Sequence, residues 1–162
     1  MSATQLFEAV DTYINSLFAA DDEILSRAVE RAQKAGLPEI QVSSGQGKLI
    51  YLLAKMIGAK RILEIGTLGG YSTVWLGRAL PKDGELISVE LDAAHVSVAR
   101  ETVKDAGLSE KVEIVEGRGL DEMRALEPSF DLVFLDANKD GYPAYLKPVS
   151  YTHLRAHETV LD

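Results

Sequence analysis

The 162-residue sequence contains no cysteine, no long uninterrupted apolar run and comparatively few basic residues. The lack of cysteine excludes disulfide bonds and thiolate metal sites, and it suits a reducing compartment. Without an apolar run of membrane-spanning length, or a basic segment followed by an apolar block at the start, we expect neither a membrane span nor a signal peptide. The 17 Lys and Arg against 25 Asp and Glu give a net charge of -8, which argues against a nucleic-acid-binding surface. We therefore expect a cytoplasmic protein whose partners are small molecules rather than nucleic acid or membranes.

The apolar pattern predicts one α/β domain, because 46% apolar residues in a chain of this length suffice for a single core. Apolar residues recur at helical spacing over 6–18, 24–32 and 49–57, and "QVSSGQG" at 41–47 is predicted to be a loop. From Lys60 onward, short apolar runs alternate with helical segments. The predicted strands are "RILEIG", "ELISVE", "KVEIVEG" and "FDLVFLD", with helices over 72–80, 93–106 and about 120–126. This alternation predicts a mostly parallel sheet with right-handed crossovers and helices on both faces.

A glycine-rich loop follows the first predicted strand, at the sheet edge where ligands bind in open α/β folds. In "EIGTLGGYS" the glycine spacing does not match the G-x-G-x-x-G pattern of dinucleotide-binding loops. A pyrophosphate would gain little from the neighbouring carboxylate of Glu64, whereas a cationic ligand would gain from it. Glu90 ends the next strand, 26 residues later, where an acid that binds ribose hydroxyls belongs. The loop and its two acids favour S-adenosylmethionine, a cationic adenosine ligand without phosphates, over NAD.

With these motifs, the stretch over about 41–147 closely resembles the cation-dependent O-methyltransferases, the group that includes catechol and caffeoyl-CoA O-methyltransferases. The resemblance is carried by "VSSGQGKLIYLLAKMIGAKRILEIGTLGGYS", "ELISVELD" and "FDLVFLDANKDGYPAYLK". It implies a Rossmann-like S-adenosylmethionine methyltransferase fold, with a helical cap over about 1–58 and a cofactor-binding part over about 59–148. It also implies an enzyme that moves a methyl group to a hydroxyl of a small, catechol-like aromatic acceptor, assisted by a divalent cation and forming a homodimer at full length.

The resemblance also implies which residues hold the cofactor. The set that it carries over is Val42, Glu64, Gly66, Thr67, Ser72, Glu90, Gly119 and Asp136. Val42 and the loop after it would lie over the methionine part, and Glu64, the Gly66 and Thr67 backbone and Ser72 would hold its amino-acid end. Glu90 would hold the ribose, and the backbone of Gly119 would approach the adenine. Where the family has a Gly-Pro-Ala-Leu string this chain reads "GRGL", which implies a looser adenine pocket and leaves Arg118 without a role.

Asp136 and Lys139 explain why the last apolar strand ends in charged residues. By the resemblance, Asp136 is a ligand of the cation, usually magnesium, and Lys139 is the general base for the acceptor hydroxyl. Magnesium prefers hard oxygen ligands and keeps positions open for substrate oxygens, and a lysine with a lowered pKa can take the proton. Asn138 stands where the family often has a second acid, so we expect no carboxylate chemistry there.

Three other features have ordinary structural interpretations. Trp75 is predicted to pack in the core. His95, at a helix start, is predicted to be a solvated histidine, although the resemblance implies that nearby residues border the adenine. His153 and His157 have i, i+4 spacing but lack the glutamate of the H-E-x-x-H metal motif.

The sequence departs from the family after Lys147. The family continues into a glycine turn and a fifth strand ending in Asp-Asn, which completes the metal site, whereas "PVSYTHLRAHETVLD" contains neither. We therefore expect the family's C-terminal strands and remaining metal ligands to be missing, 149–162 to be a non-native tail, and "DLVFL" to be an exposed apolar edge. The chain is then a weakly active or inactive fragment of the enzyme. The alternative is a non-catalytic S-adenosylmethionine-binding or dimerisation module, and the loop spacing disfavours an NAD-binding oxidoreductase fragment.

Overall fold

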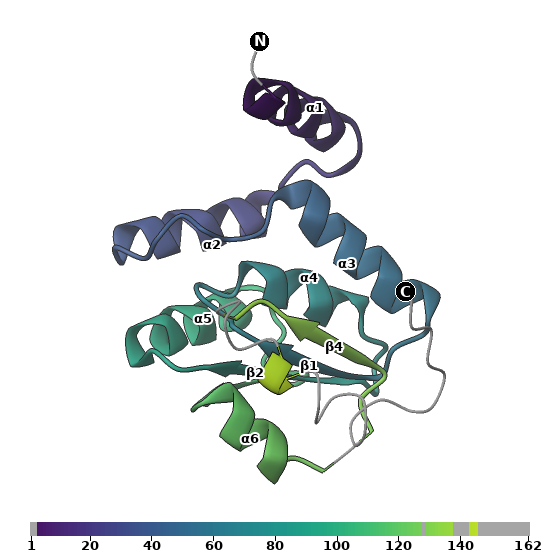
Figure 1. Ribbon diagram of the computed structural model, residues 1–162, viewed down its shortest axis with the longest axis vertical. Helices are drawn as coiled ribbons and strands as arrows, with labels where there is room; N and C mark the ends of the chain where they lie inside the picture. Colours follow the sequence, from purple (N-terminus) through teal and green to yellow (C-terminus); the bar gives the residue numbers. More distant parts are fainter. Residues whose placement is uncertain (1–2, 128, 138–142, 146–162) are drawn as a thin grey trace.

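The computed structural model describes residues 3–127, 129–137 and 143–145, and these form an α/β fold (Figure 1). The helices are α1 (Ala3–Phe18), α2 (Glu23–Lys34), α3 (Ser44–Met56), α4 (Tyr71–Ala79), α5 (Ala93–Asp105) and α6 (Gly119–Ala125). The strands are β1 (Arg61–Ile65), β2 (Glu85–Glu90), β3 (Val112–Glu116) and β4 (Leu132–Leu135). Strands and helices alternate from β1 onward as the sequence predicts.

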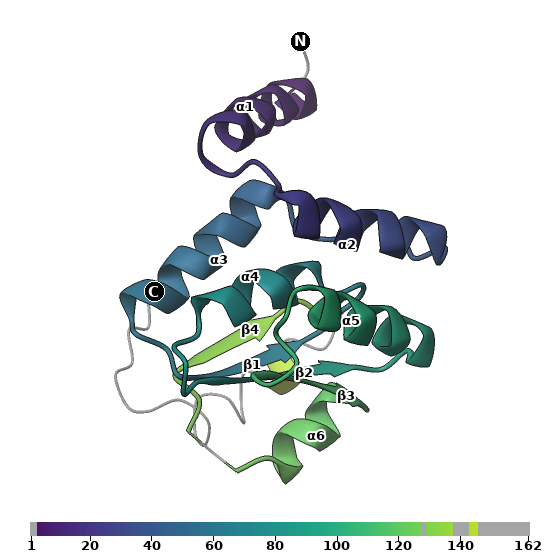
Figure 2. The same cartoon turned by 180° about the vertical axis from the view of Figure 1, so that it is seen from behind.

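The four strands form one parallel sheet in the order β3-β2-β1-β4. Leu63 of β1 stands opposite Ile87 of β2 and Val133 of β4, which fixes the register on both sides of the central strand. Helices α4 and α5 lie on one face of the sheet and α6 on the other (Figures 1 and 2). The predicted parallel sheet with helices on both faces is therefore confirmed. Among the described residues β4 forms one edge, and all four of its residues are half-buried.

The core has two parts because successive strand residues point to opposite faces. Ile62 packs with Val74 and Leu76 of α4 on one face, while Leu63 packs with Met123 and Phe130 on the other. Neither Ile62 nor Leu63 exposes any surface. Burial on both faces explains why β1 is almost continuously apolar, whereas β3, with Glu113 and Glu116 exposed, alternates. The predicted core position of Trp75 is also confirmed.

Polar contacts fix the cap onto the helices that cover the sheet. Arg27 and Arg31 of α2 both bind the carboxylate of Asp105 at the end of α5, at 2.9 and 3.0 Å. Asp22 caps the start of α2 and pairs with Arg78 of α4 at 2.7 Å. These contacts hold α2 against the layer formed by α4 and α5 (Figure 2).

Helix α3 begins earlier than the sequence analysis predicts, so the predicted loop over 41–47 is wrong for its last four residues. Ser43 is the N-cap, and its hydroxyl accepts a bond from the Gln46 amide while the Gln46 side chain accepts one from the Ser43 amide. This capping box satisfies two helix-start groups at once, which stabilises the earlier start. Gly47 then packs directly on Trp75, where a larger side chain has no room.

Helix α1 forms as predicted, yet it lies apart from the sheet, beyond α2 and α3 (Figure 1). Its large apolar side chains are all exposed: Leu6, Phe7, Val10, Tyr13, Ile14, Leu17 and Phe18. Helix α3 and its C-cap also expose apolar side chains, at Leu49, Leu52, Leu53, Met56 and Ile57. We call these two sets together the cap surface. Because α4 and α5 already cover the sheet, the apolar face of α1 has no place on it. No described helix has the length and apolar character needed to cross a bilayer.

Candidate functional site

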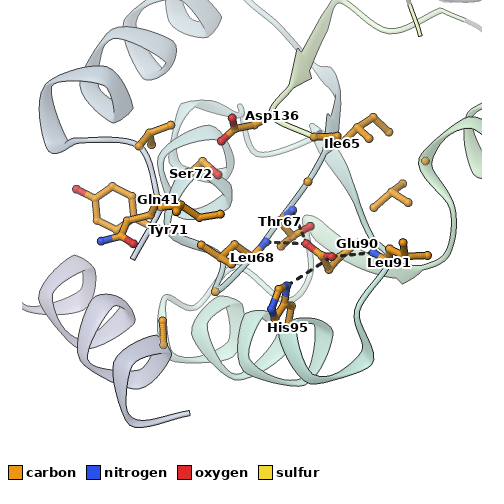
Figure 3. Close-up of a pocket in the computed structure, with 18 of the residues that line it drawn as sticks. Gln41, Ile65, Thr67, Leu68, Tyr71, Ser72, Glu90, Leu91, His95 and Asp136 are labelled. Carbon is orange, nitrogen blue, oxygen red and sulfur yellow. Dashed lines mark hydrogen bonds and ion pairs between the residues drawn. The ribbon is translucent and has the colours of Figure 1, made fainter. Parts of the chain in front are cut away.

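A pocket of about 440 Å³ lies at the carboxyl ends of the strands. Its wall is built from the segment before α3 and from the turns after all four strands, so residues far apart in the sequence meet there (Figure 3). It includes nearly the whole predicted cofactor set, namely Val42, Gly66, Thr67, Ser72, Glu90, Gly119 and Asp136. Glu64 is the member of that set that does not line the pocket.

The turn after β1 brings the backbone of Gly66 against the end of β4. Gly66 has φ +98°, and a Cβ atom there would lie 2.5 Å from the carbonyl oxygen of Asp136. The Asp136 amide donates to the Ile65 carbonyl at 2.9 Å, which fixes this approach. Gly70, with φ +86°, then begins α4. The glycines are required because the chain turns into a left-handed conformation where two strand ends meet.

Glu90 ties together the turns after β1 and β2. Its Oε2 atom accepts bonds from the Thr67 and Leu68 amides at 3.1 and 2.9 Å, and its Oε1 atom accepts from the Leu91 and Asp92 amides at 2.8 and 3.0 Å. The side chain is only 12% exposed, and it faces the pocket (Figure 3). Four amide donors hold the carboxyl group at the position predicted for a ribose-binding acid.

His95 belongs to this site, so its interpretation as a merely solvated histidine is wrong. Its Nδ1 atom lies 3.6 Å from Oε1 of Glu90, and its ring lines the pocket (Figure 3). The available signal was its place in the first turn of α5, because side chains on a helix point back toward the helix start. Here that start, capped by Asp92, adjoins the end of β2.

The carboxyl group of Glu64 lies fully buried inside a set of hydroxyl groups. It accepts bonds of 2.6 Å from Ser72, Thr73 and Ser88, and the Thr67 hydroxyl lies 2.5 Å from that of Ser88. Burial, with a smaller contribution from the charge of Asp136, raises the pKa of Glu64 to about 7 against the lowering effect of the hydroxyl bonds. In this arrangement Glu64 supports Ser72 and Thr67, which do line the pocket. Direct contact between Glu64 and the cofactor stays a prediction.

Asp136 is exposed at the pocket, beside Ser72 in Figure 3. Lys139 and Asn138 lie outside the described residues, so the predicted base cannot be placed against it. Among the residues that the structure covers, no group of three His, Asp or Glu side chains could hold a metal ion. Magnesium requires several oxygen ligands, so the described donor set does not by itself fit a cation.

Gly119 is packed tightly rather than loosely. A Cβ atom there would lie 2.5 Å from Cγ2 of Ile65 and 3.0 Å from the hydroxyl oxygen of Tyr145. The space that an alanine methyl group would take is thus already filled. The backbone of Gly119 is therefore tightly enclosed, and the looser adenine pocket stays a prediction.

Tyr71 is a pocket residue that the sequence analysis missed. Its ring lines the wall next to Ser72, and its hydroxyl donates to Oδ1 of Asp21 at 2.5 Å. Burial, together with the Asp21 carboxylate, raises the pKa of the phenol. The signal was its place between Gly70 and Ser72, at a helix start that follows a binding loop.

Comparisons with known proteins agree with this arrangement. A sequence profile described as O-methyltransferase matches residues 15–153. The catechol O-methyltransferase of Niastella koreensis is 44% identical over 147 residues, covering 88% of this chain and 66% of that protein. The catechol O-methyltransferase of Mycobacterium tuberculosis is 43% identical over 139 residues, covering 85% and 63%. The chain thus spans just under two thirds of the length of these relatives.

Solved structures show the same similarity. The O-methyltransferase TomG of Streptomyces achromogenes, in complex with S-adenosylmethionine, matches with a TM-score of 0.87 and 40% identity, covering 94% of this chain and 70% of that one. An O-methyltransferase of Bacillus cereus, in complex with S-adenosylhomocysteine, matches with a TM-score of 0.85 and 38% identity, covering 90% and 68%. The sheet is therefore a Rossmann-like methyltransferase sheet. The chain belongs to the O-methyltransferase family.

Proposed function

We propose that this chain binds S-adenosylmethionine and is the cofactor-binding part of an O-methyltransferase for a small, catechol-like aromatic acceptor. The observation that carries the proposal is the pocket itself, in which Asp136, the Gly66 turn, Glu90 and Gly119 lie along one wall of strand ends. Solved relatives contain S-adenosylmethionine or S-adenosylhomocysteine, which supports the choice of cofactor.

The cofactor's parts follow the order of the strands. Ser72 and Asp136 lie at the end suited to the amino-acid part, and Val42 lines the pocket from the segment before α3. The amide-held carboxylate of Glu90 suits the ribose hydroxyls, and Gly119 follows β3, where the base would lie. In this arrangement Glu64 would act through Ser72, whose hydroxyl group it holds in position.

In the proposed reaction, the acceptor hydroxyl oxygen attacks the methyl carbon and the carbon–sulfur bond breaks, leaving a neutral thioether. Lys139 takes the hydroxyl proton. Holding the two reactants in line at near-attack distance supplies much of the rate in such a transfer. A divalent cation bound at Asp136 would supply Lewis-acid activation of the acceptor oxygen. The described residues supply only part of the ligand set that such a cation needs.

The acceptor class rests on the similarity to the two catechol O-methyltransferases. A comparison of catechol with phenol at equal concentrations tests it, since phenol lacks the second, neighbouring hydroxyl of a catechol. Equal methylation of both would contradict a catechol-like acceptor. Lys139→Ala should abolish whatever weak turnover the chain has without changing cofactor affinity, and turnover that survives the substitution would remove Lys139 as the base.

Calorimetric titration with S-adenosylmethionine, S-adenosylhomocysteine and NAD tests the cofactor. We expect the two adenosyl ligands to bind and NAD not to bind. Glu90→Gln should weaken adenosyl binding at least tenfold, a loss expected for charge-assisted hydrogen bonds. Glu85→Gln is the matched control, because Glu85 lies at the opposite end of the same strand, away from the pocket. Binding of NAD alone would overturn the proposal.

We also propose a cytoplasmic homodimer, paired through the cap surface. Monomeric proteins rarely leave so many large apolar side chains of two neighbouring helices exposed, and a second copy offers the same apolar surface. The cap surface equally favours the second candidate function, a non-catalytic binding or dimerisation module. Light scattering should give a dimer that Phe7→Ser with Phe18→Ser converts to a monomer. A monomer for the unaltered chain would contradict the pairing, and a dimer without cofactor binding would favour the second candidate.

A further inference from the structure

The order of the strands places a bound adenosyl ligand across the sheet. The turns after β4, β1, β2 and β3 lie side by side in that order, and three strand spacings span about 14 Å. If the amino-acid part lies by Asp136 and the ribose by Glu90, the base lies under the turn after β3. This step rests on the proposed function.

Two side chains that the proposed function leaves without a role line the pocket at this base end. Leu91 follows Glu90 and is 69% exposed, although it is apolar. Arg118 lies in the turn after β3, and its side chain is 79% exposed. The amide of Gly117 donates to the Glu90 carbonyl at 2.9 Å, so the two turns are held next to each other. The base end is therefore flanked by one apolar and one cationic side chain.

Among the described residues, the contact that holds the Arg118 guanidinium in its present place is weak. Its Nε atom lies 3.7 Å from Oδ2 of Asp121, and both side chains are largely exposed. Exposed ion pairs of this kind contribute little free energy. Asp121 also lies 3.8 Å from Arg124, so its charge stays paired when Arg118 moves. Arg118 can therefore turn toward a ligand at small cost.

We propose that Arg118 contacts the adenine ring and is a specificity-determining residue for the base of the cofactor. A planar guanidinium stacks on aromatic faces and donates to ring nitrogens, which lysine does less well. Leu91 supplies an apolar surface for the same base. Arg118 thereby provides a cationic contact at the position where the related string has proline.

The test compares two ligands that differ only in the base. S-adenosylhomocysteine carries adenine, and S-ribosylhomocysteine has the same amino-acid and sugar parts without it. We expect Arg118→Ala to weaken S-adenosylhomocysteine about three- to tenfold and to leave S-ribosylhomocysteine unchanged. Arg118→Lys should recover only part of the loss, because it keeps the charge without the planar group.

Arg124→Ala is the matched control, since Arg124 shares Asp121 and a similar exposure but does not line the pocket. It should change neither affinity. Unchanged affinity of Arg118→Ala for S-adenosylhomocysteine would overturn the inference, and so would an equal loss for both ligands. If the unaltered chain binds neither ligand, the proposed function itself fails, and the inference falls with it. Thermal melts of all variants check that the fold is intact.

Discussion

The hydroxyl of Tyr71 and the carboxylate of Asp21 form a hydrogen bond of 2.5 Å that joins the pocket wall to the segment between α1 and α2. Asp22, the next residue, pairs with Arg78, about two turns further along α4. Two successive acids thus fasten this segment to the helix that carries Ser72. The position of the cap and the shape of the pocket are therefore linked through α4.

Tyr71→Phe should lower the free energy of unfolding by about 1.5–3 kcal/mol, the usual range for a hydrogen bond to a charged group. Urea denaturation measures this directly. Tyr13→Phe is the control, because Tyr13 is exposed on α1 and its loss of a hydroxyl should cost nothing. Equal effects of the two substitutions would mean that the Asp21 contact contributes no stability.

Glu64→Gln should change how stability depends on pH. The pKa of Glu64 is about 7 in the folded chain against 4.5 ordinarily, so the folded state holds a proton that the unfolded state releases. The free energy of unfolding should therefore fall as pH rises from about 4.5 to about 7, by up to about 3 kcal/mol, and then level off. Glutamine does not titrate, so the variant should lose this slope.

Denaturation at about pH 5 and about pH 8 checks the slope. Acids with a lowered pKa, such as Asp92 and Asp105, change the stability at pH values below their ordinary pKa of 3.8. They therefore do not contribute to the change expected between about pH 5 and about pH 8. If the free energy of unfolding of Glu64→Gln still falls over this pH range, the pH dependence comes from another group.

Gly66→Ala should weaken S-adenosylmethionine binding more than tenfold and destabilise the fold. Alanine is strained in the left-handed backbone conformation of Gly66, and its methyl group would lie 2.5 Å from the carbonyl oxygen of Asp136. The turn must therefore move. Gly107→Ala separates the two effects, because Gly107 has φ +68° but open space around its Cβ position. It should cost only about 1–2 kcal/mol of backbone strain and leave binding unchanged. Equal binding losses would refute a specific role for the Gly66 approach.

Gly119→Ala and Ile65→Leu should be coupled. The alanine methyl would overlap Cγ2 of Ile65, and overpacking of this kind costs about 1–3 kcal/mol. Leucine has no branch at Cβ, so it removes the overlapping atom at the cost of some packing. The double variant should be more stable than the sum of the single changes predicts. If the changes in the free energy of unfolding are additive, a side chain at position 119 does not overlap Ile65.

Strand β1 was predictable because burial on both faces leaves a local signature. A residue pair such as Ile62 and Leu63 must be apolar on both sides of the sheet, and that requirement appears as a continuous run in the sequence. The glycine turn and Glu90 were predictable for a related reason, since strand ends define where ligands bind in this topology. The family resemblance supplied the assignment of the remaining pocket residues.

Other features depend on contacts between distant segments and were missed or misjudged. His95 joins the site only because α5 begins beside the end of β2, and Gly119 lacks space only because Ile65 and Tyr145 fill it. The burial of Glu64 depends on hydroxyl groups from α4 and β2. The early start of α3 was different, because the Ser43 and Gln46 capping box was visible in the sequence and could have been used.

The four backbone amides that donate to Glu90 compete with the ribose hydroxyls of a ligand for the same carboxylate oxygens. A sugar hydroxyl that approaches this carboxylate must share its lone pairs with amides that already hold them, or displace those amides. Exchanging one donor for another yields little net enthalpy. Binding that displaced Thr67 and Leu68 would also loosen the turn that contacts the ligand, and the freedom gained there would offset the ordering of the ligand. The loss of affinity expected for Glu90→Gln would then come as much from the loosened turns after β1 and β2 as from lost contacts with the sugar.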